Sequence, residues 1–114
     1  MAKKYFHNKI VRDNVPDNIY KAGDDCEVRT LSHSEARIEL RKKLIEEASE
    51  LLNAEKKELV DELADVLEVV KSIAQSENIR LPEIEKHRLL KAARAGRFKK
   101  RIFLVWSNKP AGGK

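Results

Sequence analysis

Two acidic motifs lie close together in strongly helical sequence: Glu-Glu-Ala-Ser-Glu, which ends at Glu50, and Glu-Leu-Ala-Asp, which begins at Glu62. Residues three apart on an α-helix lie about 60° apart around its axis. Glu47 and Glu50 therefore present oxygen atoms to one side of a helix, and Glu62 and Asp65 do the same. Hard divalent cations such as Mg²⁺ prefer oxygen ligands of this kind. The two motifs thus indicate two helices that can pool their carboxylates around a divalent cation.

The first of these helices has a clear start and an apolar stripe. Ser32 and the glutamate three positions on have the spacing of a capping box, which predicts that the helix starts near His33 or Ser34. Apolar residues then recur at intervals of four and three, at Leu40, Leu44, Ala48 and Leu51. Glu47 falls at the edge of this stripe. Glu46 points much further round, so it is predicted to be solvated or an outer member of the site.

The second helix is predicted over roughly 57–77 and has a broader apolar face. Its apolar positions cover nearly half the circumference, which predicts a well-buried helix; they are Leu59, Val60, Leu63, Val66, Leu67, Val70, Ile73 and Ala74. Glu62 and Asp65 flank this face. Because acids beside a core are costly unless they are paired, we infer that something cationic, a metal or a basic side chain, sits between the two helices.

Proline and glycine mark two further helices. Pro16 suits the first turn of a brief helix over residues 16–21, which Gly23 ends. A third long helix is predicted over residues 82–95, with its proline in the first turn and Gly96 at its end. A helical hairpin with a third helix is therefore the expected frame, and the fold class is all-α.

Short extended segments are predicted on either side of this frame. Residues 26–31 alternate in polarity, and residues 101–106 are rich in β-prone side chains. The second segment is expected either to pair with another extended segment or to cover the bundle. Residues 111–114 are expected to form a mobile tail.

Length and composition favour one compact, cytoplasmic domain over residues 1–114. The net charge is +5, yet 19 acidic residues are present, so the surface is mixed. This balance suits a polyanionic ligand held partly through a metal, and it also suits nucleic acid. The single cysteine, Cys26, favours a reducing compartment, and no apolar run approaches the ~20 residues of a membrane helix.

Two other interpretations compete with a metal site. The acidic motifs can be an ordinary charged helix face with salt bridges to Lys43 or Lys57. The basic stretch over residues 86–101 can be a solvated face or can bind nucleic acid, with Phe98 and Phe103 stacking on bases. A helical interaction protein without activity would keep the apolar stripes and would need no metal.

Four motifs in order resemble one family. The pattern E-E-x-x-E followed by E-x-x-D resembles the all-α nucleotide pyrophosphohydrolases, the superfamily of MazG and of phosphoribosyl-ATP pyrophosphohydrolase. Residues 8–16 are similar to the N-K-L-V-R-D-K-I-P motif of its house-cleaning branch, and three further stretches follow in the order of that branch, at residues 42–47, 61–68 and 91–98.

The resemblance implies a MazG-like helical bundle that assembles as a homodimer or homotetramer. It implies Mg²⁺, with Mn²⁺ as an alternative, and hydrolysis of a nucleoside triphosphate between its α and β phosphates. Phosphoribosyl-ATP is the alternative substrate.

Residue roles follow from the matching motifs. The resemblance makes metal ligands of Glu47, Glu50, Glu62 and Asp65, with Glu46 as an additional or outer one; Glu47 and Glu50 are the candidates for activating water. It makes phosphate contacts of Lys9, Arg12, Lys43, Lys91 and Arg94. Two departures concern the substrate contacts, because Asn14 stands where the family has a lysine, and residues 95–98 replace its R-G-G-F loop.

Overall fold

The computed structural model describes residues 3–110 and is all-α, as predicted. It contains four α-helices and one short 3₁₀ helix, and no strand forms within residues 3–110; the helices are α1 (Val15–Lys21), α2 (His33–Leu52), η1 (Lys56–Glu58), α3 (Leu59–Ser76) and α4 (Leu81–Ala95). The chain divides into two units, Met1–Asn78 and Ile79–Lys114. A single domain over residues 1–114 stays a prediction.

Helix α2 starts where its capping box predicts. The Ser32 hydroxyl accepts a hydrogen bond from the Glu35 backbone N–H at 3.2 Å, and the Glu35 carboxylate accepts one from the Ser32 N–H at 3.1 Å. Arg29 also donates to this carboxylate, at 3.0 Å. The hydrogen bond from Arg29, followed by those from Ser32, lowers the pKa of Glu35 to about 2. The start of the helix is thus fixed by local polar contacts.

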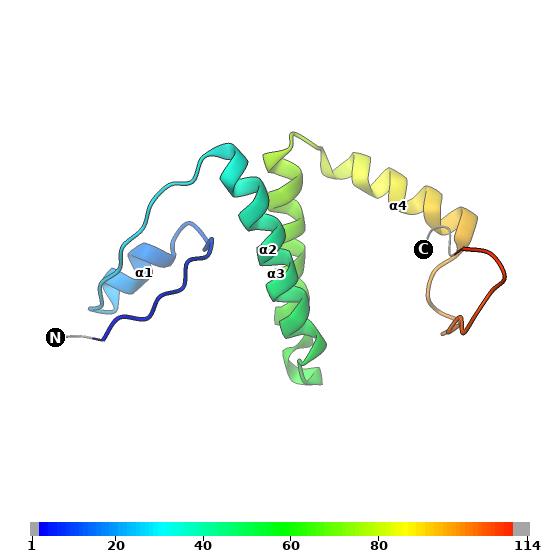
Figure 1. Ribbon diagram of the computed structural model, residues 1–114, viewed down its shortest axis with the longest axis horizontal. Coiled ribbons are helices and arrows are strands. Elements are labelled where there is room, and N and C mark those ends of the chain that lie inside the picture. Colours follow the sequence, from blue (N-terminus) through cyan, green and yellow to red (C-terminus); the bar gives the residue numbers. More distant parts are fainter. Residues whose placement is uncertain (1–2, 111–114) are drawn as a thin grey trace. The chain divides into compact units, whose positions relative to one another are not determined.

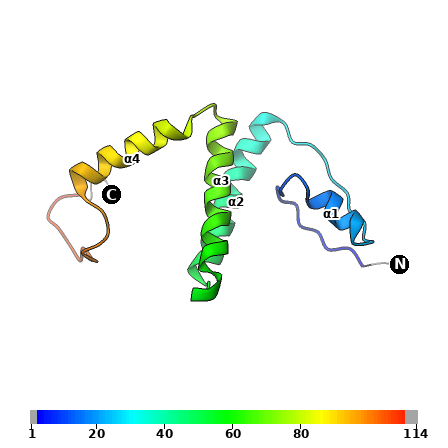
Figure 2. The same ribbon diagram turned by 180° about the vertical axis from the view of Figure 1, so that it is seen from behind.

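Helices α2 and α3 form an antiparallel hairpin that carries both acidic motifs. They run side by side in opposite directions in both views (Figure 1 and Figure 2). The connection between them is short because Asn53 caps α2 and the turn η1 leads directly into α3. At the other end of the hairpin, the Arg37 guanidinium donates to Glu77 at 2.5 Å. The hairpin therefore places the second half of α2 beside the first half of α3.

The core of this hairpin is small. Val69 and Ala74 are buried hydrophobic residues, whereas Leu63 and Leu67 are each 54% exposed. The prediction that α3 is well buried is therefore wrong for the single chain. The physical reason is that one neighbouring helix covers only a stripe, whereas the apolar face of α3 extends around nearly half of the helix.

The remaining helices, α1 and α4, end where predicted and begin one residue before the predicted prolines. Proline occupies the first turn of both α1 and α4, and Gly23 and Gly96, with φ of 86° and 84°, follow their last turns. The predicted extended segments lack regular pairing, and the large apolar side chains from Ile102 to Trp106 are exposed. The predicted tail, 111–114, lies outside the described residues. Among the helices of the described part, none has the length and apolar character needed to cross a membrane.

Candidate metal centre

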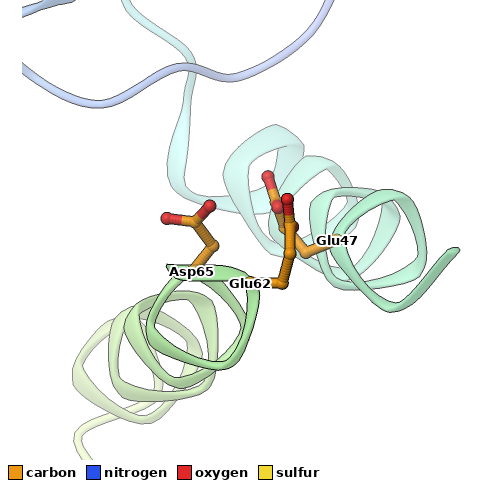
Figure 3. Close-up of side chains that lie close together, drawn as sticks. All are labelled: Glu47, Glu62 and Asp65. Carbon is orange, nitrogen blue, oxygen red and sulfur yellow. The ribbon is translucent and has the colours of Figure 1, made fainter. Parts of the chain in front are cut away.

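Three carboxylates of the two acidic motifs meet between α2 and α3. Glu47 comes from α2, and Glu62 and Asp65 come from α3. One oxygen atom of each lies within 4.8 Å of the others. The three side chains point to the same side of the helix pair (Figure 3). This geometry arises because the antiparallel hairpin places one motif against the other.

Two oxygen atoms of this cluster lack the partners that burial normally requires. Glu47 is only 7% exposed, and its Oε2 atom is buried without a hydrogen-bond partner in the described structure. Glu62 Oε2 is in the same situation. A buried carboxylate oxygen without a donor or a cation is costly. The donor set therefore fits a hard divalent cation, which takes carboxylate oxygens as ligands.

The pKa values of two carboxyls report the same excess of negative charge. Burial, followed by the charges of Asp65 and Glu47, raises the pKa of Glu62 above 4.5. The negative charge of Glu47, followed by burial, raises the pKa of Glu50. Glu50 itself is exposed and lies outside the group of three. The protein thus holds these carboxyls where their ionised forms repel one another.

The metal-free protein is expected to become more stable as the pH falls from neutral towards 4.5. The pKa values of Glu50 and Glu62 are higher in the folded protein than the ordinary value of 4.5. The folded protein therefore binds more protons than the unfolded chain in this window. The repulsion is fully present above the folded pKa values, and protonation relieves it as the pH falls. Urea unfolding at a series of pH values in EDTA measures the effect.

A double variant, Glu50→Gln with Glu62→Gln, provides the comparison because it cannot take up these protons. Its stability should rise less than that of the native protein over the same window. Below pH 4.5 the sign reverses, because Glu35, whose folded pKa is about 2, loses its contribution as the pH falls from about 4.5 to about 2. Glu46, Glu77 and Glu85, whose folded pKa values are also lowered by their ion pairs, lose theirs in the same direction. Equal slopes for both proteins between neutral pH and 4.5 would contradict the assigned repulsion.

Lys43 lies between two of the acids of α2. Its Nζ atom is 3.3 Å from Glu46 Oε2 and 3.3 Å from Glu47 Oε1, and its side chain is only 19% exposed. Burial alone would lower the pKa of Lys43, but its hydrogen bonds to Glu47 and Glu46, together with their charges, outweigh burial and raise it. Lys43 therefore pairs with Oε1 of Glu47 and not with Oε2, the buried atom without a hydrogen-bond partner in the described structure.

Two basic residues from the segment before α1 also contact the acidic motifs. Lys9 Nζ donates to Glu46 Oε1 at 2.8 Å, and Arg12 Nη2 donates to Asp65 Oδ1 at 2.8 Å. Both residues are predicted to contact phosphate, and their ion pairs with Glu46 and Asp65 are not predicted from the sequence. Charge was the one feature of the sequence that could have predicted these contacts, because a basic motif attracts acidic motifs in the same small chain.

The alternative interpretation, in which the acidic motifs form salt bridges to Lys43 or Lys57, is therefore only partly confirmed. Lys43 does pair with them, but Lys57 pairs instead with Glu55, at 3.6 Å. The ion pairs do not reach the two buried oxygen atoms that lack donors in the described structure. A charged helix face alone does not explain those two atoms.

The last two predicted contact residues lie in the second unit. Lys91 and Arg94 are both exposed on α4, three positions apart, and so share one side of that helix. Their predicted contact with phosphate stays a prediction, as do the predicted roles of the other site residues.

The fold and the site thus define a class: an all-α protein with a candidate metal centre between the two helices of a hairpin. The family model for phosphoribosyl-ATP pyrophosphohydrolase matches residues 12–88, more than half of the chain, and the chain belongs to this family. The family is part of the MazG-like all-α pyrophosphohydrolase superfamily. Neither the curated proteins nor the solved structures contain a match to this chain.

Membership in this family makes the protein a pyrophosphohydrolase, an enzyme that hydrolyses an acid-anhydride bond. Enzymes of this kind are typically metal-dependent, in agreement with the carboxylate cluster. The matched region contains all the acids of the two motifs together with Arg12 and Lys43. It begins after Lys9 and ends before Lys91.

Proposed function

We propose that this protein is a Mg²⁺-dependent nucleoside triphosphate pyrophosphohydrolase with a house-cleaning role. It would cleave the bond between the α and β phosphates and give a nucleoside monophosphate and pyrophosphate. The proposal rests on one observation: Glu47 and Glu62, on facing helices within one carboxylate cluster, each have a buried oxygen that no donor among residues 3–110 reaches. A cluster of this composition is suited to divalent cations that also bind a polyphosphate.

Four carboxylates form the proposed ligand set. Glu47, Glu62 and Asp65 supply the cluster, and Glu50 joins them from the next turn of α2. A bound Mg²⁺ or Mn²⁺ supplies two kinds of chemistry, a lowered pKa for coordinated water and neutralisation of phosphate charge. Four negative charges exceed the charge of one divalent ion, which favours two or more ions when a substrate is bound.

The residue best placed to take a proton from the attacking water is Glu50. Its carboxyl is exposed and lies outside the group of three, whereas Glu47 is buried and pairs with Lys43. In the reaction, the water oxygen bonds to the α phosphorus, and the bond from that phosphorus to the bridging oxygen breaks. Glu50 accepts the proton, and pyrophosphate leaves with the bonding electron pair. Glu47 is the second candidate for this role.

Basic side chains would hold the phosphates and stabilise the leaving pyrophosphate. Lys43 lies beside the cluster, and Lys9 and Arg12 contact its edges. Lys91 and Arg94 would supply further contacts from α4. The exposed apolar face of α3 favours assembly as a homodimer or homotetramer. A cytoplasmic location stays a prediction.

Phosphoribosyl-ATP is the second candidate substrate, since the matching family carries its name. It presents the same triphosphate to the site, so the proposed chemistry is unchanged. The N-terminal motif over residues 8–16, which resembles that of the house-cleaning branch, favours nucleoside triphosphates.

The native protein is expected to release pyrophosphate from at least one member of a panel of canonical and modified nucleoside triphosphates and phosphoribosyl-ATP. Replacing Glu50 by alanine should lower the rate by about 100-fold or more, the usual loss when a general base is removed. Product analysis with Mg²⁺, and separately with Mn²⁺, measures both reactions and ranks the substrates.

Glu68→Ala is the matched control, because Glu68 is an exposed acid on α3 that accepts a hydrogen bond from the Ser72 hydroxyl and lies outside the carboxylate cluster. Its rate should stay within about twofold of the native rate, as expected for a surface change outside the site. A native protein that releases no pyrophosphate from any member of the panel, with either metal, would refute the proposal. Salt-sensitive RNA binding would then favour the nucleic-acid interpretation.

A further inference from the structure

We infer that Glu46 is a positioning residue that holds two lysines beside the carboxylate cluster, and that it is not a metal ligand. This inference rests on the proposed function, because the lysines are placed there to bind phosphate. Glu46 is the first acid of its motif, and its neighbour Glu47 belongs to the cluster. The two adjacent acids therefore have different tasks.

Both oxygen atoms of Glu46 are already engaged by ammonium groups. Oε1 accepts from Lys9 at 2.8 Å, and Oε2 lies 3.3 Å from Lys43 Nζ. In contrast, Glu47 and Glu62 each keep one buried oxygen that no donor reaches in the described structure. A carboxylate whose charge is balanced by two lysines is a poorer cation ligand than one with a free, buried oxygen.

The contacts of Glu46 join segments that are distant in the sequence. Lys9 precedes α1, and Glu46 and Lys43 lie on α2, one turn apart. A second ion pair joins the same N-terminal segment to α3, through Arg12 and Asp65. Glu46, together with Asp65, thus anchors the N-terminal basic motif beside the cluster.

This anchoring prepares the lysines for a polyphosphate. A lysine ammonium has three N–H donors, and Lys43 directs two of them to Glu46 and Glu47, which leaves one for a phosphate oxygen. Without Glu46, the flexible side chains of Lys43 and Lys9 would have to be ordered when the substrate binds. That cost would weaken substrate binding more than it would slow the chemical step.

The experiment compares Glu46→Gln with the native protein and with Glu39→Gln. Glu39 is a matched control because it also lies on α2 and pairs with a lysine, Lys42, at 3.3 Å. Glu46→Gln is expected to raise KM for the triphosphate by about fivefold, as for the loss of a partly exposed ion pair, and to change kcat by less than about twofold. Glu46→Asp should recover part of the loss, and Glu39→Gln should leave KM unchanged.

Two further readouts separate positioning from metal binding. The increase in melting temperature on adding Mg²⁺ should be the same for Glu46→Gln and for the native protein. In a Lys9→Met background, Glu46→Gln should raise KM by a smaller factor than it does in the native protein, because part of the effect of Glu46 is exerted through Lys9. Loss of the Mg²⁺ effect in Glu46→Gln, or fully additive effects on KM, would overturn the inference.

The failure of this inference can be told apart from the failure of the proposed function. If the native protein cleaves no triphosphate, the proposed function is refuted. In that case, calorimetric titration with inorganic pyrophosphate in Mg²⁺ replaces KM as the readout for the same variants. Weaker pyrophosphate binding by Glu46→Gln with an unchanged Mg²⁺ effect would support positioning, and unchanged pyrophosphate binding would overturn it.

Discussion

Glu62→Gln is expected to lower kcat/KM for pyrophosphate release by about 100- to 1000-fold. The substitution keeps the size of the side chain and removes the charge of a carboxylate whose Oε2 is buried without a donor in the described structure. A catalytic divalent ion contributes several kcal/mol to transition-state stabilisation, and each ~1.4 kcal/mol lost is a factor of ten in rate. Initial rates at saturating Mg²⁺ with the best substrate of the panel measure the loss.

The same substitution should make the metal-free protein more stable. Burial, followed by the charges of Asp65 and Glu47, raises the pKa of Glu62, so removing its charge removes both the cost of burial and the repulsion. Asp61→Asn is the matched control, because Asp61 is the exposed neighbour of Glu62 on α3. A Glu62→Gln protein that is folded and as active as Asp61→Asn would show that Glu62 does not serve the metal.

Mg²⁺ is expected to stabilise the native protein by about 2.7 kcal/mol when its concentration is 100 times its dissociation constant. The proposed site exists only where folding has gathered Glu47, Glu62 and Asp65, so the unfolded chain would offer the ion no comparable site. EDTA should reverse the effect. Thermal unfolding at fixed protein concentration measures it as an increase in the melting temperature, of several degrees per kcal/mol for a domain of this size.

Glu47→Gln should abolish this stabilisation, whereas Glu39→Gln, on the same helix, should keep it. NaCl at matched ionic strength is the second control, because salt alone screens the repulsion between carboxylates. A melting temperature that rises equally with NaCl and with Mg²⁺ would mean that both salts act only by screening the repulsion between the carboxylates. That result would count against a specific metal site.

The sequence predicts the helices well because their ends depend on local chemistry. The capping box at Ser32 fixes the start of α2, and Gly96 marks the end of α4. The three carboxylates of the cluster are also found from sequence, because helical spacing and the antiparallel hairpin are enough to bring Glu47 to Glu62 and Asp65. Local rules thus account for the helical frame and for the centre of the site.

The contacts around that centre are not predicted from sequence, because they depend on tertiary arrangement. Lys9 and Glu46 are 37 positions apart, and helical periodicity carries no information about such a pair. The exposure of Leu63 and Leu67 is missed for a related reason. An apolar face in the sequence predicts that a helix packs against other elements. It does not predict how much of that face the single chain buries.

The closeness of the cluster residues in the sequence also bears on how the chain folds. All three lie between residues 47 and 65, on two helices joined by a short connection. Contacts this local lose little loop-closure entropy, so we expect the hairpin to form early in folding. The repulsion between Glu47 and the two acids of α3 then opposes the step that closes the hairpin. A divalent cation would consequently speed folding itself, in addition to slowing unfolding.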